Sequence, residues 1–381
     1  MSETLFSKIK IGNVTIDNRI GLAPMTRTSA TATGLATENM AQYYANFARG
    51  GFGLVITEGT YTDEAYSQGY LNQPGIATKE QTEAWKKVVK AVHQEGSKIV
   101  LQLMHAGALS QGNRFKEQSI GPSAIKPKGE KLSFYGGEGE FSTPKEMTEE
   151  DISQVIQGFV TSAKNAKEAG FDGVEIHGAN GYILDQFLTD YTNERQDQYG
   201  GSTENRMRLL IEVVQAVREA VGQDYPVGIR IGQAKVNDPD HKWKNGEADA
   251  EIIFSQLGEA NVDYIHIPEP KATEPAFGES GPTLVELVKK YGNTIAIANG
   301  SLEDPQLAKN LLAEGKADIV TIGKGALSNQ DWPKKVLNGQ DLSEFDFKKF
   351  LLPKATLKDF EVKPKIAIIS EGMACGPDGL C

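Results

Sequence analysis

A short pattern that ends a helix and starts a strand recurs along this chain of 381 residues. In each copy a helical stretch closes on Gly or Asn, a short link with an apolar residue follows, and a run rich in Val and Ile comes next. Gly or Asn at that point supplies the left-handed conformation that ends a helix, and the run is typical of a parallel strand buried under helices. The clearest copies are residues 49–57, 168–176, 259–267 and 314–322.

Eight such strands can be counted, and a helical pattern follows each of them. The helical stretches carry apolar residues at spacings of three and four, as at Ile152, Val155 and Phe159. Eight alternating units favour a closed (β/α)8 barrel over an open doubly wound sheet, and no early G-x-G-x-x-G motif supports the open form. The predicted strands are residues 20–23, 54–57, 99–103, 174–176, 227–231, 264–267, 294–298 and 319–322.

We therefore expect an α/β fold in which residues 1–340 form a single TIM barrel. Residues 8–18 alternate in polarity around a turn, which predicts a hairpin capping the N-terminal mouth of the barrel. Residues 106–147 form a long insertion after the third strand, and a loop of that length on the catalytic face is more often a functional lid than filler. Residues 341–381 are predicted to be a partly helical C-terminal extension whose tail is mobile or docked on a partner.

Composition and charge exclude several classes of protein. The formal net charge of -11 argues against nucleic acid or an anionic membrane as the main partner. The N-terminus lacks the apolar core of a signal peptide, and no stretch reaches the roughly 18 apolar residues of a membrane helix. Cys375 and Cys381 are too few for a disulfide framework or a four-thiolate cluster. We expect a cytoplasmic protein that is a monomer or a homodimer.

The last two strand ends point to a phosphate-bearing ligand. In TIM barrels the active site lies at the C-terminal ends of the strands, and the loops after strands seven and eight commonly bind phosphate through backbone N–H groups. Here Asn299-Gly300-Ser301 and Gly323-Lys324-Gly325 supply small residues and one cation at those places. The alternative is that these glycines only turn the strand into a loop.

The strand ends also carry residues used by two other kinds of barrel enzyme, metal-dependent hydrolases and Schiff-base aldolases. Three histidines stand at strand ends, but the closely spaced H-x-H of many barrel metal sites and a supporting carboxylate cluster are missing from the sequence, so we predict no metal. A Schiff-base aldolase needs a lysine at a strand end, and Lys235 lies past the fifth strand without an obvious partner. Another phosphate-binding barrel enzyme, an isomerase or an aldolase, remains the alternative.

The segment HGANGYILDQFL at residues 177–188 follows the fourth strand and continues into Asn193-Glu194-Arg195. It is the most specific of several segments at these strand ends that resemble the Old Yellow Enzyme family of NAD(P)H:flavin oxidoreductases. The resemblance is collinear and extends over nearly the whole chain, to about Leu337. The other matching segments are residues 18–20, 23–27, 56–60, 102–107, 199–202 and 204–206.

The resemblance implies a non-covalent FMN and a ping-pong reaction. NADPH or NADH would reduce the flavin, and hydride would then pass from flavin N5 to the C=C bond of an α,β-unsaturated carbonyl or nitro compound. Enones, nitroalkenes and quinones are the implied partners. By the same resemblance, Pro24, Met25, Thr26, Gly59 and Gln102 line the isoalloxazine, Arg230 faces its N1/C2 region, and Asn299, Gly300, Gly323 and Lys324 hold the phosphate.

The resemblance also implies roles for three residues after the fourth strand. His177 and Asn180 would donate hydrogen bonds to the substrate oxygen, and Tyr182 would protonate Cα from the face opposite the hydride. The alternative is a catalytically idle flavin-binding protein, which would have no need for these three residues beside Arg230. Lys324 stands where an arginine is usual, so a point charge replaces a bidentate fork.

The resemblance leaves two questions open. His105 could either brace the site or contact the cofactor. Thr26 resembles the classical branch of the family, whereas Gln102-Leu103-Met104-His105-Ala106-Gly107 resembles the thermophilic-like branch.

Overall fold

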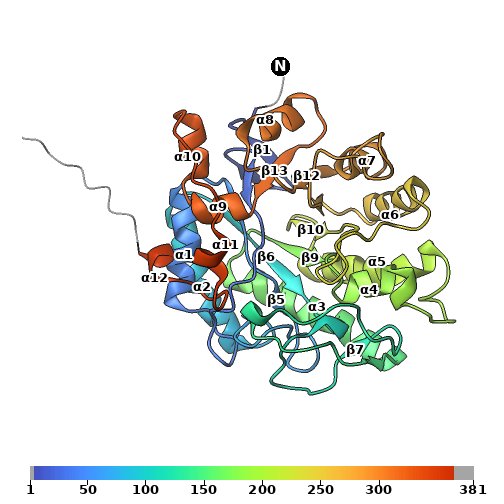
Figure 1. Cartoon of the computed structure of the whole chain (residues 1–381). Helices are drawn as coiled ribbons and strands as arrows, with labels where there is room; N and C mark the ends of the chain where they lie inside the picture. Colours follow the sequence, from blue (N-terminus) through green and yellow to red (C-terminus); the bar gives the residue numbers. More distant parts are fainter. Residues whose placement is uncertain (1–3, 364–381) are drawn as a thin grey trace, which may run out of the picture.

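Eight parallel strands close into a barrel in the computed structural model, which describes residues 4–363 (Figure 1). The strand order is β4-β3-β13-β12-β11-β10-β9-β6, and pairing of β4 with β6 completes the ring. The predicted (β/α)8 fold is confirmed, and every predicted strand end lies within one residue of the observed end. The strands are β3 (Ile20–Leu22), β4 (Leu54–Ile56), β6 (Lys98–Met104), β9 (Gly173–His177), β10 (Val227–Arg230), β11 (Tyr264–Pro268), β12 (Ile295–Asn299) and β13 (Ile319–Ile322).

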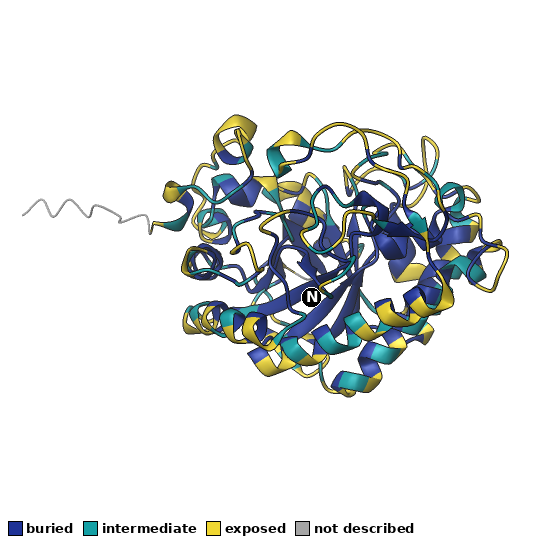
Figure 2. Cartoon of the chain, turned by 90° about the horizontal axis from the view of Figure 1, so that it is seen from below, coloured by how far each residue is buried: buried dark blue, intermediate teal, exposed yellow. Residues whose placement is uncertain are grey.

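Helices surround the barrel and bury one face each, so that in Figure 2 the strands are buried while the outer helix faces are exposed. Helix α3 shows which local interactions determine where a helix begins and ends. The Thr148 side chain caps its first turn, with Asp151 bonding back to the Thr148 N–H at 2.8 Å. Gly170, at φ 93°, ends it. The helices are α1 (Glu38–Arg49), α2 (Lys79–Gln94), α3 (Glu149–Ala169), α4 (Ile183–Leu188), α5 (Thr203–Val221), α6 (Glu247–Glu259), α7 (Leu284–Tyr291), α8 (Pro305–Ala313), α9 (Lys324–Ser328) and α10 (Trp332–Leu337).

The predicted N-terminal hairpin is present as β1 (Ile9–Ile11) and β2 (Val14–Ile16), paired antiparallel. Its buried residues Ile11 and Ile16 join a cluster with side chains from the strands, including Leu54 and Ile319. Since Leu54 and Ile319 are the first residues of their strands, the hairpin closes the N-terminal mouth of the barrel. The C-terminal strand ends are therefore the end at which a ligand can enter.

The insertion after β6 crosses the C-terminal end of the barrel. It contains the short 3-10 helices η1 (Gly107–Leu109) and η2 (Ser133–Tyr135) and the two-residue strands β7 (Ile120–Gly121) and β8 (Lys145–Glu146). A further two-residue strand, β5 (Thr60–Tyr61), pairs with β6. As predicted, the insertion is a long connection rather than an additional barrel unit.

The C-terminal segment packs back onto the barrel through α11 (Phe347–Leu351) and α12 (Asp359–Val362). The buried guanidinium of Arg27 donates to Glu361 at 2.5 and 2.7 Å, and the Ala355 N–H donates to the Phe134 carbonyl at 2.8 Å. The predicted tail, with Cys375 and Cys381, lies outside the described residues. Among residues 4–363, none of the helices combines the length and the apolar character needed to cross a membrane.

Candidate active site

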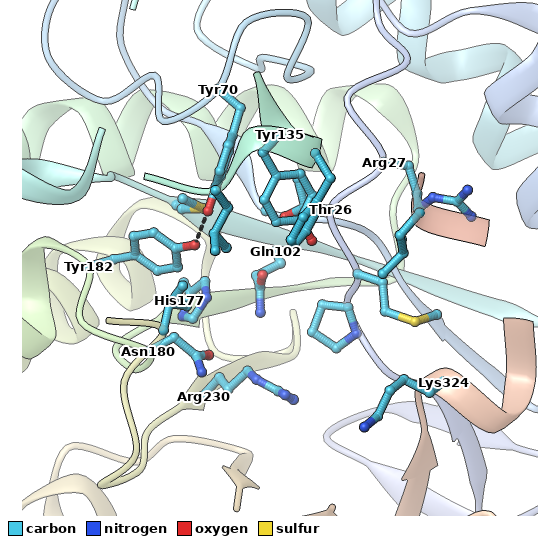
Figure 3. Close-up of a pocket in the computed structure, with 18 of the residues that line it drawn as sticks. Thr26, Arg27, Tyr70, Gln102, Tyr135, His177, Asn180, Tyr182, Arg230 and Lys324 are labelled. Carbon is cyan, nitrogen blue, oxygen red and sulfur yellow. Dashed lines mark hydrogen bonds between the residues drawn. The ribbon is translucent and has the colours of Figure 1, made fainter. Parts of the chain in front are cut away.

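A cavity of about 340 Å³ opens at the C-terminal ends of the strands, below the insertion. Ten of the thirteen residues that the sequence predicted for the site line it (Figure 3). They come from six different strand ends or following loops, as expected for a barrel enzyme. These ten are Pro24, Met25, Thr26, Gly59, Gln102, His177, Asn180, Tyr182, Arg230 and Lys324.

The other three predicted residues lie outside this lining. Asn299 stands behind Arg230, and its Oδ1 accepts a hydrogen bond from the guanidinium at 2.9 Å. Gly300 has φ 135°, and a Cβ there would lie 1.9 Å from the Glu269 carbonyl oxygen, so packing alone requires glycine. A Cβ at Gly323 would make ordinary van der Waals contacts, with Ala23 Cβ at 3.8 Å and Met25 Sδ at 3.9 Å. Their part in holding a phosphate stays a prediction.

A buried polar network supports the floor of the cavity. Gln102 Nε2 donates to one oxygen of Glu175 at 2.8 Å, and the other oxygen lies 2.8 Å from His266 Nδ1. His266 Nε2 in turn lies 2.7 Å from a guanidinium nitrogen of Arg230. Burial raises the pKa of Glu175, but His266 and Arg230 outweigh it and lower that pKa below its usual range. Burial lowers the pKa of Arg230 to about 10, so the guanidinium is charged at neutral pH.

His177 and Asn180 stand together at the end of β9. His177 is the last residue of the strand, and Asn180 has a left-handed backbone with φ 61°. Burial, followed by the nearby charge of Arg230, lowers the pKa of His177 to about 3. The imidazole is therefore neutral at physiological pH, and together with the Asn180 amide it offers uncharged N–H donors beside the cavity.

Three tyrosines, Tyr182, Tyr70 and Tyr135, line the cavity next to His177. The hydroxyls of Tyr182 and Tyr70 are hydrogen-bonded to each other (Figure 3), and the rings of Tyr70 and Tyr135 lie 4.9 Å apart. The His177 ring meets the Tyr182 ring edge-on at 5.0 Å. Burial raises the pKa of Tyr182 and of Tyr70, so both hydroxyls keep their protons at neutral pH.

Tyr70 and Tyr135 were not predicted for the site. Tyr70 lies in the irregular segment between β5 and α2, and Tyr135 lies in η2 of the insertion. Neither residue stands at a strand end, so the strand pattern gives no signal for them. For Tyr135 the one available signal was the length of the insertion, which predicts a lid but not which of its residues reach the cavity. Leu132 and Phe134 of the same insertion also line it.

Neither His105 nor Lys235 is among the residues that line the cavity. His105 is buried, and its Nδ1 accepts the Gly107 N–H at the start of the insertion at 3.1 Å. Lys235 Nζ is bonded to both carboxylate oxygens of Asp185 at 2.9 Å, which removes it as a free Schiff-base amine. Within residues 4–363 no group of three or more His, Cys, Asp or Glu side chains is placed to hold a metal ion.

The cavity suits a flavin ring. Such a ring needs a flat space, a hydrogen-bonding edge and positive charge where electrons accumulate on reduction. Gly59 lets Met104, which also lines the cavity, pack closely, since a Cβ at position 59 would lie 2.4 Å from Met104 Sδ. Gln102 Nε2 donates its hydrogen bond to Glu175. The Gln102 Oε1, which lies next to Gly59, is therefore available to accept a hydrogen bond. Arg230 supplies a desolvated cation at the same edge.

Comparison with known sequences agrees with this site. The profile of the NADH:flavin oxidoreductase / NADH oxidase family matches residues 4–343. A putative 12-oxophytodienoate reductase 6 of Oryza sativa subsp. japonica is 36% identical over 87% of this chain and 83% of its own length. An NADH oxidase of Thermoanaerobacter brockii is 35% identical over 88% of this chain, and the chain spans about half, 51%, of the length of that relative.

Solved structures give the same result. An Old Yellow Enzyme homologue from Zymomonas mobilis superposes with a TM-score of 0.84 at 29% identity, covering 94% of this chain and 98% of the other. Morphinone reductase in complex with tetrahydroNAD superposes with a TM-score of 0.81 at 32% identity, with the same coverage of 94% and 98%. The isomerase or aldolase alternative is not favoured. The chain therefore belongs to the NADH:flavin oxidoreductase / NADH oxidase family, which is the Old Yellow Enzyme family of FMN-dependent NAD(P)H ene-reductases.

Proposed function

We propose that the cavity reduces the activated C=C bond of α,β-unsaturated carbonyl compounds, nitroalkenes or quinones. The observation that carries the proposal is the corner formed by His177, Asn180 and Tyr182. Neutral N–H donors there lie next to a protonated hydroxyl, at the edge of a cavity whose floor holds the cation of Arg230. FMN, when bound, supplies the carrier that takes hydride from NAD(P)H and delivers it to the substrate carbon.

His177 and Asn180 bind the carbonyl or nitro oxygen of the substrate. Because both are neutral donors held in a water-poor corner, they stabilise the negative charge that develops on this oxygen as Cβ gains hydride. A charged imidazolium in the same place would also attract anions that cannot react. The burial that keeps His177 neutral therefore favours neutral, polarised substrates.

Tyr182 donates the proton that completes the reduction at Cα. Its hydroxyl is hydrogen-bonded to Tyr70, which holds the donor in one orientation. Since burial raises the pKa of Tyr182, the proton leaves only when a basic carbon forms within reach. Proton and hydride then reach the substrate from opposite faces, and the addition is trans.

The remaining predicted residues would bind and orient the cofactor. Pro24, Met25, Thr26 and Gly59 would line its ring, and Gln102 and Arg230 would meet its polar edge. Asn299, Gly300, Gly323 and Lys324 would hold its phosphate. We further propose that the protein is cytoplasmic and a monomer or a homodimer.

The substitution Lys324→Arg is expected to strengthen the binding of FMN. A lysine offers a point charge, whereas arginine offers a planar fork that matches phosphate oxygens. We expect the dissociation constant of FMN to fall about tenfold, equivalent to about 1.4 kcal/mol. Fluorescence titration of the apoprotein with FMN measures it, and Lys316→Arg, on the surface before β13, is the control. An unchanged constant in both variants would remove Lys324 from the phosphate site.

The oxidative half-reaction should show no imidazole titration. Because the pKa of His177 is lowered to about 3, the ring is already neutral throughout the range of about pH 5 to 8 in which an ordinary histidine titrates. The rate of reoxidation by 2-cyclohexenone, an uncharged substrate, is measured across that range in the wild type and in His177→Asn. A step near an ordinary histidine pKa that disappears in His177→Asn would contradict a neutral His177.

Isotope labelling tests the proposed function as a whole. The enzyme is supplied with a deuterated nicotinamide in H₂O, and separately with the unlabelled nicotinamide in D₂O, using a cyclic enone substituted at Cα. We expect label from the nicotinamide at Cβ and label from solvent at Cα, on opposite faces of the product. Label from solvent at both carbons, or no reduced product, would overturn the proposal.

A further inference from the structure

A buried ion pair lies behind the active-site loop and takes no direct part in the proposed reaction. Lys235 Nζ is 2.9 Å from both oxygens of Asp185, and the two side chains are 2% and 0% exposed. Asp185 belongs to the first turn of α4, and Lys235 to the loop after β10. The pair therefore joins the loops that follow two neighbouring strands, β9 and β10.

The carboxylate fixes the residue next to Asn180. Asp185 Oδ2 accepts the N–H of Gly181 at 2.7 Å. Gly181 has φ 87° and Asn180 has φ 61°, so two successive residues are held in left-handed conformations. Asparagine adopts this conformation more readily than other residues with a side chain, but two successive left-handed residues depend on contacts that hold them.

The loop after β10, which carries Lys235, also contacts Asn180. The Val236 N–H donates to the Asn180 carbonyl at 3.1 Å, and Asn180 and Lys235 form an isolated parallel β-bridge. Lys235 is kept in place by its own N–H, which donates to the Asp238 carbonyl at 3.1 Å. Asn180 is thus bonded directly to the β10 loop, its neighbour Gly181 is bonded to Asp185, and the ion pair joins Asp185 to the β10 loop.

We infer that Asp185 and Lys235 form a positioning pair that holds the Asn180 amide in its oxygen-binding orientation. The inference rests on the proposed function, in which Asn180 binds the substrate oxygen. The charges of the pair are important because the bond to Asn180 comes from the β10 loop and the bond to Gly181 comes from Asp185 in α4. Without the attraction between Asp185 and Lys235, the β10 loop can withdraw and release the left-handed turn.

The test is a double-mutant cycle read by ligand binding. p-Chlorophenol is titrated into the FMN-loaded enzyme, and its long-wavelength charge-transfer band gives the dissociation constant. The variants are Asn180→Ala, Lys235→Met and the double variant. We expect each single variant to weaken binding about tenfold. We expect the double variant to be no weaker than Asn180→Ala alone, because residues that act through one another are not additive.

Two further variants separate positioning from general destabilisation. Asp185→Asn keeps an acceptor for the Gly181 N–H but removes the charge, and it serves if Lys235→Met does not fold. We expect it to weaken phenol binding as well. Arg218→Met is the control, because it breaks the Arg218–Asp263 pair at the opposite end of the barrel. It should lower the melting temperature and leave the dissociation constant of p-chlorophenol unchanged.

The outcomes distinguish this inference from the proposed function. If Asn180→Ala weakens phenol binding but Lys235→Met and Asp185→Asn do not, or if the effects add in the double variant, the positioning role is overturned. If Asn180→Ala itself leaves the constant unchanged, the oxygen-binding role fails and the inference fails with it. An effect of Arg218→Met on phenol binding equal to that of Lys235→Met would likewise overturn the specific role.

Discussion

Tyr182→Phe is expected to slow reoxidation of the reduced enzyme by 2-cyclohexenone by about 10²–10⁴-fold, the usual contribution of a positioned general acid. The substitution keeps the ring that packs against His177 and removes the proton that Cα receives. Reduction of the bound flavin by the nicotinamide needs no proton from Tyr182, so its rate should stay nearly the same. Anaerobic stopped-flow spectroscopy measures the two half-reactions separately.

Tyr70→Phe is the matched control for this prediction. It removes the hydroxyl that orients Tyr182 and leaves the acid itself in place, so we expect a smaller loss, confined to the same half-reaction. Equal losses of Tyr182→Phe in both half-reactions would contradict the general-acid role, because the residue would then be acting on the shape of the cavity or on the flavin.

The second large effect is expected from the oxygen-binding corner. His177→Ala and Asn180→Ala should each slow enone reduction by about 10²–10³-fold, the cost of removing one donor to a developing oxyanion. Phenolic ligands should bind more weakly to both variants, and in His177→Ala their long-wavelength charge-transfer band should be lost at concentrations that saturate the wild type. Steady-state and single-turnover kinetics with 2-cyclohexenone measure the rates, and absorbance titration measures the binding.

His93→Ala is the control for this pair, since His93 is a partly exposed histidine of α2 bonded to Asp172, away from the cavity. It should leave both the rate and the phenol titration unchanged. A phenol titration of His177→Ala that overlays the wild type would remove His177 from the oxygen site, whatever the change in rate.

The barrel could be predicted closely because one local pattern repeats. A helix ends at Gly or Asn because these residues adopt the left-handed backbone conformation that helix termination needs. A buried parallel strand is recognised by its run of Val and Ile residues. Gly170 before β9 shows both signals within a few residues. The hairpin and the insertion followed as the segments that do not fit the pattern.

The site was predictable only where it stands at strand ends. His177, Asn180 and Tyr182 follow β9 directly, so motif and position agree. Gly300 shows the limit, because the glycine that resembles a phosphate loop is also required by contact with Glu269. The sequence alone cannot separate these two causes.

Contacts between segments that are far apart in the chain could not be predicted from the sequence. The pairing of Arg27 with Glu361 joins residues 334 positions apart, and no local pattern specifies it. The partner of Lys235 was likewise missed, because Asp185 lies in another loop and becomes its neighbour only when β9 and β10 pair.

The central claim is that one cavity serves NAD(P)H and an activated alkene in turn. Anaerobic double-mixing stopped-flow tests it most directly: the FMN-loaded enzyme is first mixed with NADPH or NADH, and then with 2-cyclohexenone. We predict loss of the oxidised flavin absorbance in the first step and its full return in the second, with one equivalent of cyclohexanone formed. A flavin that neither nicotinamide reduces, or that the enone does not reoxidise, would contradict the account.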